Sequence, residues 1–193
     1  MAASEQDFVK RLQAGDPAAY EELIENYAEM VYRVAYRILQ DPHDAEDAMQ
    51  ETFLTVYRRI GSFRGDSKFS TWLYRIATNA ALDMIRARQR KQGQDLAWDE
   101  TEEEGAPLPD TLTPLPEEVL MRREALALLE EGLQQLSPKL RTALVLYELE
   151  GLSMKEVAEV LGISTSAAKV RVHRARLLLQ ENLQHRLAEL TSS

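Results

Sequence analysis

The sequence has 193 residues with a formal net charge of −9, and it contains no cysteine. The absence of cysteine excludes disulfide bonds and thiolate metal sites. No apolar run reaches the roughly 18 residues that a transmembrane helix needs, and the N-terminus has no signal-peptide core. We therefore expect a cytoplasmic protein that is not inserted in a membrane.

Apolar residues recur at helical spacing along most of the chain, and no alternating run indicates a strand. We therefore expect an all-α fold. A short helix lies near the N-terminus, and Asp16-Pro17 then begins a long helix that ends before Asp41-Pro42.

A third helix is expected over residues 44–60. Its outward side carries Asp47, Gln50, Glu51 and Leu54. An acidic stripe that includes an outward leucine is consistent with a protein-binding surface. The alternative is an ordinary solvated helix face.

Residues 61–70, GSFRGDSKFS, contain two glycines and are expected to form a loop. The loop also contains the aromatic residues Phe63 and Phe69 and the cations Arg64 and Lys68. Aromatic rings interleaved with cations suit unstacked bases, which need a ring to lie on and a charge near their phosphates. The alternative is that the phenylalanines tether the loop to the core.

The next helix is expected to be capped by Ser70 and to end near Lys91. From Arg58 to Lys91 there are nine basic residues and two acidic ones, a pattern typical of a nucleic-acid surface. Steps of three and four align one stripe of this helix. The stripe consists of Trp72, Arg75, Asn79, Asp83, Arg86 and Arg90.

Residues 92–116 are expected to form a flexible acidic linker between domains at 1–91 and 117–193. Nine acidic residues and no Lys or Arg lie between Gln92 and Met121. The remainder, 32 − 9 acids against 23 Lys and Arg, is balanced at 23 each. A balanced charge predicts weak binding to free DNA and therefore a partner that supplies further contacts.

The stretch from Ser153 to Arg176 predicts a helix-turn-helix. Ser153 and Glu156 have capping-box spacing, Gly162 permits the turn, and Ser164 caps the second helix. A short basic helix on such a turn suits the DNA major groove, with a solvated helical hairpin as the alternative. The outward arc of the second helix consists of Ser166, Lys169, His173 and Arg174, with Arg176 at its edge.

No catalytic or metal-binding arrangement emerges from the sequence. His43, His173 and His185 are scattered and have no metal-ligand spacing with carboxylates. Glycine-rich phosphate loops are also missing. We therefore expect neither an enzyme nor a cofactor.

Three segments together resemble bacterial RNA polymerase sigma factors of the extracytoplasmic-function group, in the sigma-70 family. DAEDAMQETFLTVYRRI resembles the polymerase-binding helix, FRGDSKFSTWLYRIATNAALDMIR the promoter-melting loop and helix, and LSMKEVAEVLGISTSAAKVRVHRAR the C-terminal helix-turn-helix. The segments occur in the family's order. The resemblance implies two helical domains, regions 2 and 4, that dock on core polymerase and direct it to promoters.

The resemblance also implies roles for individual residues. The polymerase clamp coiled coil would contact Asp44, Asp47, Gln50, Glu51 and Leu54, while the second domain would grip the flap. The −35 duplex would be read by Ser164, Thr165, Ser166, Lys169, Val170, Arg171, His173, Arg174 and Arg176. The −10 element would be opened and held by Phe63, Arg64, Lys68, Phe69, Trp72, Arg75, Asn79 and Arg86. An anti-sigma factor is a further expected partner.

Two other functions remain open from the sequence. One is a stand-alone helix-turn-helix regulator with an N-terminal interaction domain, and the other is a pure interaction protein such as a polymerase inhibitor. The basic and aromatic loop argues against the regulator, because a dimerisation domain needs no cationic surface for single strands.

Overall fold

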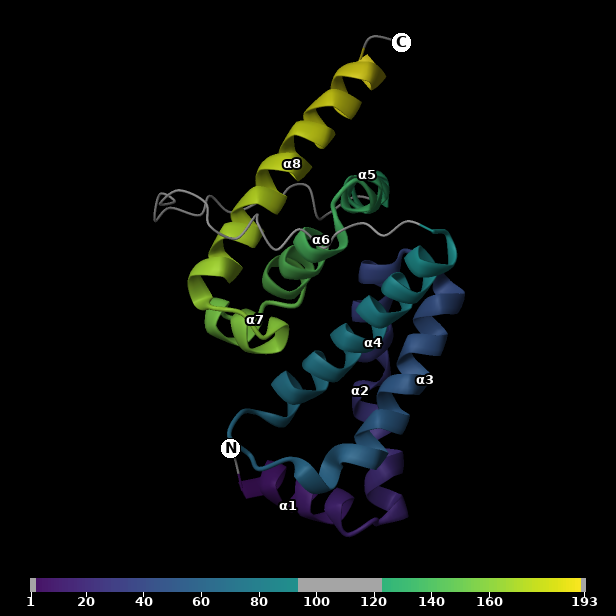
Figure 1. The fold of residues 1–193 in the computed structure, drawn as a ribbon, viewed down its shortest axis with the longest axis vertical. Coiled ribbons are helices and arrows are strands. Elements are labelled where there is room, and N and C mark those ends of the chain that lie inside the picture. Colours follow the sequence, from purple (N-terminus) through teal and green to yellow (C-terminus); the bar gives the residue numbers. More distant parts are fainter. Residues whose placement is uncertain (1–2, 94–122, 192–193) are drawn as a thin grey trace. The chain divides into compact units, whose positions relative to one another are not determined.

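The structure, a computed structural model, describes the backbone of residues 3–93 and 123–191 (Figure 1). All regular secondary structure in these two ranges is helical, which confirms the predicted all-α fold. The chain divides into two compact units, Met1–Gln94 and Asp95–Ser193, and each is described by itself. The predicted linker lies outside the described residues apart from its first two positions.

The first unit contains four α-helices and one 3-10 turn. They are α1 (Ala3–Gln13), α2 (Pro17–Leu39), α3 (Pro42–Arg59), η1 (Ile60–Ser62) and α4 (Phe69–Lys91). The side chain of Asp16 accepts a hydrogen bond from Ala18 N at 3.0 Å, and that of Asp41 accepts one from Asp44 N at 3.0 Å. Each aspartate therefore caps a helix whose first residue is proline. The pair Asp16-Pro17 predicts this start, whereas α3 begins two residues before the expected start at 44.

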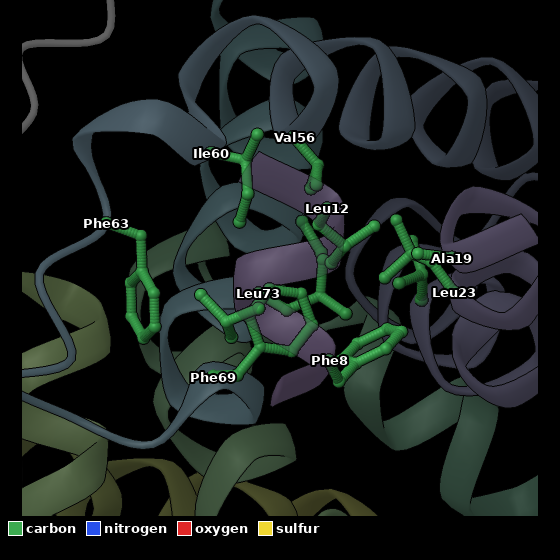
Figure 2. Packing of buried hydrophobic residues seen from close by; sticks show 12 residues of the cluster. Phe8, Leu12, Ala19, Leu23, Val56, Ile60, Phe63, Phe69 and Leu73 are labelled. Carbon is green, nitrogen blue, oxygen red and sulfur yellow. The ribbon is translucent and has the colours of Figure 1, made fainter. Parts of the chain in front are cut away.

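The core of the first unit lies where its helices meet. Helices α2, α3 and α4 each pack against the other two, and α1 packs on α2 and η1. Figure 2 shows apolar side chains from all of these elements converging on one cluster. Burial of each large apolar side chain contributes about 1.5–3 kcal/mol. The cluster includes Phe8, Leu12, Leu23, Val56, Ile60, Phe63, Phe69 and Leu73.

Helix α4 begins two residues earlier than the sequence predicts, and Ser70 is not its cap. The N-cap position is Lys68, whose side chain makes no capping hydrogen bond. Phe69, the first residue of the helix, is fully buried in the core. The backbone N–H of Phe69 instead donates a hydrogen bond to the Glu5 carboxylate of α1, at 2.6 Å.

The second unit contains α5 (Arg123–Gln134), α6 (Pro138–Leu144), the π-helical turn η4 (Val145–Leu149), α7 (Met154–Leu161) and α8 (Thr165–Thr191). Its core includes Leu133, Leu144, Val172 and Leu179. The predicted start of the first helix near residue 117 lies outside the described residues. No helix in the described ranges combines the length and hydropathy that crossing a membrane requires.

The predicted helix-turn-helix is confirmed at α7 and α8. The Ser153 and Glu156 side chains each accept a hydrogen bond from the other's backbone N–H, which completes the capping box. Gly162 ends α7 with a φ of 67°, a left-handed conformation that glycine adopts readily. Ser164 Oγ then accepts a hydrogen bond from Ala167 N at 3.1 Å and caps α8.

Candidate nucleic-acid interface

Phe63, within the loop at residues 61–68, and Phe69, which follows the loop, are both core residues. Phe63 is 8% exposed and Phe69 is fully buried. Figure 2 shows both rings in the cluster, and their centres are 5.9 Å apart at 86°. The centre of the Phe63 ring also lies 5.2 Å from that of the Trp72 ring. The burial of both rings supports the tethering alternative, and a contact of either ring with a base stays a prediction. The local sequence did not distinguish the two, because an aromatic ring in a polar loop satisfies both patterns.

The polar residues of the loop remain exposed. Arg64, Asp66 and Lys68 all lie at the surface, while Trp72 in the first turn of α4 is half-buried. Gly65 has a φ of 78°, which a residue with a side chain rarely adopts. The loop therefore exposes two cations beside a partly accessible indole, and its aromatic anchors lie beneath.

The predicted stripe of α4 is largely exposed, as expected. Arg75, Asn79, Asp83, Arg86 and Arg90 all lie at the surface, while the opposite side of the helix is buried. Within the stripe, Arg86 Nη1 lies 2.6 Å from Asp83 Oδ1. This pair is exposed and contributes little to stability. The guanidinium of Arg86 is therefore partly neutralised by the neighbouring carboxylate.

The first turn of α8 is the most exposed part of the predicted recognition helix. Ser164, Thr165, Ser166 and Lys169 are exposed. The hydroxyls of Ser164 and Ser166 lie 3.0 Å apart. These side chains form a polar tip with one cation, as helix-turn-helix proteins place toward base edges.

Further along α8, the predicted DNA contacts are partly covered. Val170, Arg171, His173 and Arg174 are all half-buried. Burial lowers the pKa of Arg171 from its ordinary value, although an arginine remains charged at neutral pH. These side chains therefore keep only part of their surface available for a ligand.

Arg176 is not on the exposed arc, which corrects the prediction. Its guanidinium forms an ion pair with the Glu148 carboxylate of η4 and lies 5.4 Å from the centre of the Tyr147 ring. The pair is nearly buried, so Arg176 holds α8 against the preceding segment rather than facing a groove. The sequence pattern missed this because the partner lies 28 residues away.

The outward stripe of α3 is exposed as predicted. Leu54 is 49% exposed, and Asp47, Gln50 and Glu51 are also at the surface. Asp44 differs from them, because it is only partly exposed and forms an ion pair with Arg88 at the end of α4. That bond joins the first turn of α3 to the last turn of α4, so Asp44 has a structural partner.

Sequence reasoning missed one apolar residue beside this stripe. Tyr57 is 66% exposed, although its ring centre lies 5.4 Å from that of Tyr20 in α2. Tyr57 follows Leu54 by three residues, a spacing that places both on one side of a helix. That spacing was the available signal. Leu54 and Tyr57 together give the acidic face an apolar centre.

Comparison with known proteins now identifies the chain. Residues 23–91 match sigma-70 region 2, and residues 126–179 match sigma-70 region 4. The RNA polymerase sigma-H factor of Pseudomonas aeruginosa is 38% identical over 98% of this chain and 100% of its own length. The chain belongs to the sigma-70 family. This sigma factor is also 35% identical to the extracytoplasmic-function (ECF) sigma factor SigW of Bacillus subtilis, over 91% of the chain and 95% of the relative.

Solved structures agree on the fold. The sigma factor resembles CnrH, solved with the cytosolic domain of CnrY, with a TM-score of 0.68 and 23% identity over 95% of this chain and 99% of CnrH. It also resembles RpoE of Bartonella quintana, solved with the anti-sigma factor NepR. There the TM-score is 0.65 and the identity 23%, over 86% of this chain and 96% of RpoE. The chain is therefore a sigma factor of the ECF group with the fold of that group.

Proposed function

We propose that this sigma factor directs core RNA polymerase to promoters and starts transcription there. The observation that carries the proposal is the helix-turn-helix of α7 and α8, whose second helix exposes a polar first turn. The exposed basic surface on α4 adds a second, chemically different nucleic-acid surface. A protein with both can bind one promoter element as duplex and another as a single strand.

Duplex recognition belongs to the first turns of α8. In this motif the N-terminal residues of the recognition helix contact base edges in the major groove. Ser166 and Lys169, both exposed, would read the −35 element. Arg171, His173 and Arg174 are half-buried and would contact phosphates at the rim of the groove.

Strand opening belongs to the loop and α4. Arg64 and Lys68 would bind phosphates of the displaced strand, and the half-buried Trp72 offers an edge against a base. Arg75 and Asn79 supply donors for a flipped base. Extrusion of a base costs a few kcal/mol, which these contacts offset. Phe63 and Phe69 contribute by holding the loop.

Core polymerase completes the mechanism. Outside the acidic stretch between Gln92 and Met121, acidic residues and Lys plus Arg are balanced at 23 each, so we expect the chain alone to bind free DNA weakly despite its local basic surfaces. The face of α3 with Asp47, Gln50, Glu51, Leu54 and the added Tyr57 would dock on the clamp coiled coil of polymerase. The second unit would bind the flap. Polymerase then supplies the remaining affinity for the promoter.

An anti-sigma factor in the cytoplasm is the proposed regulator. The solved RpoE structure contains an anti-sigma factor, NepR, bound to that protein. In this chain the exposed Leu54 and Tyr57 make the α3 face a surface that an inhibitor could cover. An inhibitor on this face would compete with polymerase, and competition for holoenzyme assembly tests this point.

Run-off transcription with core enzyme on a promoter library tests the proposed function. The full chain with core polymerase should yield transcripts from a subset of promoters, and core polymerase without the chain should not. A gel shift should show promoter binding only when polymerase is present. Specific duplex binding by the chain alone, without transcription, would instead support a stand-alone regulator.

A further inference from the structure

Helix α1 contacts both ends of the loop that connects α3 to α4. Gln13 Nε2 donates to the carbonyl oxygens of Ile60, at 3.2 Å, and Phe63, at 3.0 Å, where the loop begins. Glu5 Oε1 accepts a hydrogen bond from Phe69 N at 2.6 Å, where the loop ends. One helix therefore fixes the backbone on both sides of the segment that contains Arg64 and Lys68.

Apolar contacts support these three hydrogen bonds. Phe8 lies between Glu5 and Gln13 along α1, and its ring meets that of Phe69 edge to face, with centres 5.6 Å apart at 89°. Leu12 is fully buried in the same cluster (Figure 2). Steps of three and four residues place Glu5, Phe8 and Leu12 on one side of the helix. This side of α1 is therefore built against the end of the loop.

The Glu5 carboxylate also settles the electrostatics at the start of α4. No side chain from the α4 segment caps this helix, so its first N–H would otherwise attract an anion. A charged acceptor at 2.6 Å occupies that position with a charge-assisted hydrogen bond. The carboxylate therefore occupies the Phe69 N–H, and Arg64, Lys68 and Arg75 are exposed cations that can hold the strand.

We propose that Glu5 and Gln13 are positioning residues for promoter opening, which act by fixing the loop at residues 61–68 in the conformation that receives the displaced strand. The inference rests on the proposed function of that loop. It extends the opening apparatus to α1, which precedes the segment matching sigma-70 region 2, residues 23–91. Neither residue needs to touch DNA.

The test uses the full chain assembled with core polymerase. Glu5→Ala and Gln13→Ala, singly and combined, are compared with Asp7→Ala and Gln6→Ala, which remove the same kinds of side chain from exposed positions of α1. Permanganate reactivity of −10 thymines measures opening. The double variant should open duplex promoter roughly tenfold more slowly, consistent with the loss of hydrogen bonds that include a charged acceptor. Polymerase affinity should not change.

Three further readouts separate positioning from a general effect on folding. Hydrogen exchange at the Phe69 amide should quicken in Glu5→Ala but not in Asp7→Ala. Glu5→Gln keeps an acceptor and should recover part of the opening rate. A template with a pre-melted −10 bubble should restore most of the activity of the double variant, since the loop no longer has to capture a strand from duplex.

Several outcomes would overturn the proposal. Normal opening by the double variant despite faster exchange at Phe69 would mean that the loop needs no fixing. Equal losses in the Asp7 and Gln6 controls, or a parallel loss of polymerase affinity, would assign α1 a purely structural role. If the parent chain gives no transcripts with core enzyme, the proposed function fails instead, while exchange at Phe69 still reports whether α1 holds the loop.

Discussion

Arg176 of α8 and Glu148 of the π-helical turn η4 form an ion pair whose side chains are only 11% and 15% exposed. The guanidinium also lies 5.4 Å from the centre of the Tyr147 ring, within the range of a cation–π interaction. The pair joins the recognition helix to the segment that follows α6. The ion pair therefore helps to fix the position of α8 against η4 within the second unit.

Removal of one member of this pair should destabilise the second unit. Arg176→Met leaves the Glu148 carboxylate buried without a cation and should lower the free energy of unfolding by about 3 kcal/mol. The double variant Arg176→Met with Glu148→Leu should cost less than Arg176→Met alone, because no charge is then stranded. Hydrogen exchange of α6 and α8 amides measures the effect, with the exposed Gln180→Met as control. A double variant less stable than either single variant would contradict this account.

Phe69 should prove to be a stability residue of the first unit. Its ring is fully buried among aromatic neighbours, so Phe69→Ala should lower the free energy of unfolding by about 3–5 kcal/mol. Lys68→Ala, at the adjacent exposed position, should change it by less than about 0.5 kcal/mol. Urea unfolding followed by Trp72 fluorescence compares the two. Equal stability of both variants would mean that Phe69 is not a core residue.

The outward face of α3 should be required for holoenzyme assembly. Leu54→Arg combined with Asp47→Arg places two cations on an acidic face with an apolar centre, so co-purification with core polymerase should be lost. Because Leu54 is 49% exposed, circular dichroism should show no unfolding. Glu25→Arg, at an exposed position of α2 outside this face, is the control. Normal assembly of the double variant would remove α3 from the interface.

Lys169 should contribute directly to the −35 contact. Lys169→Ala should weaken binding of the holoenzyme to a cognate promoter by about 1–3 kcal/mol if the ammonium reads a base, and it should then discriminate less against a scrambled −35 element. Equal weakening on both sequences, with a salt dependence reduced by about one charge, would instead indicate a phosphate contact. No change on either promoter would exclude Lys169 from the interface.

Gly132 should be required for close packing of α5 on α8. A Cβ at this position would lie 2.4 Å from Leu179 Cδ1, and Leu179 is fully buried, so its side chain has no free space to enter. Gly132→Ala should therefore cost about 1–3 kcal/mol from overpacking, more than alanine gains in helix propensity. Thermal melting measures the change. Gly61→Ala is a useful comparison, since nothing lies within 4 Å of its Cβ position.

Local signals in the sequence predicted most helix boundaries. The Asp-Pro pair at the start of α2, the capping box of Ser153 and Glu156, and the turn at Gly162 all appear where expected. In each case the donor and acceptor lie within a few residues of each other. Such features need no knowledge of the tertiary fold, because the interaction is complete within one segment.

Features that depend on distant partners could not be predicted. Ser70 has the residue type of a cap, but burial of Phe69 and a bond from Glu5, 64 residues away, determine the start of α4. Arg176 has the spacing of a groove residue, but Glu148 binds it from the π-helical turn. A helical wheel gives the direction of a side chain, not what lies there. The exposed surfaces were therefore predicted, but the burial of Phe63 and Phe69 and the ion pair of Arg176 were not.

Helix α8 continues far past its groove-facing turn, with 27 residues from Thr165 to Thr191. At 1.5 Å per residue it forms a rod of about 40 Å, and its sequence contains no proline or glycine at which a helix would kink. A tilt imposed on its distal end must therefore displace the tip at Ser166 in the opposite direction, about a fulcrum where Leu179 is buried. A ligand far from the DNA could adjust promoter contact through leverage alone.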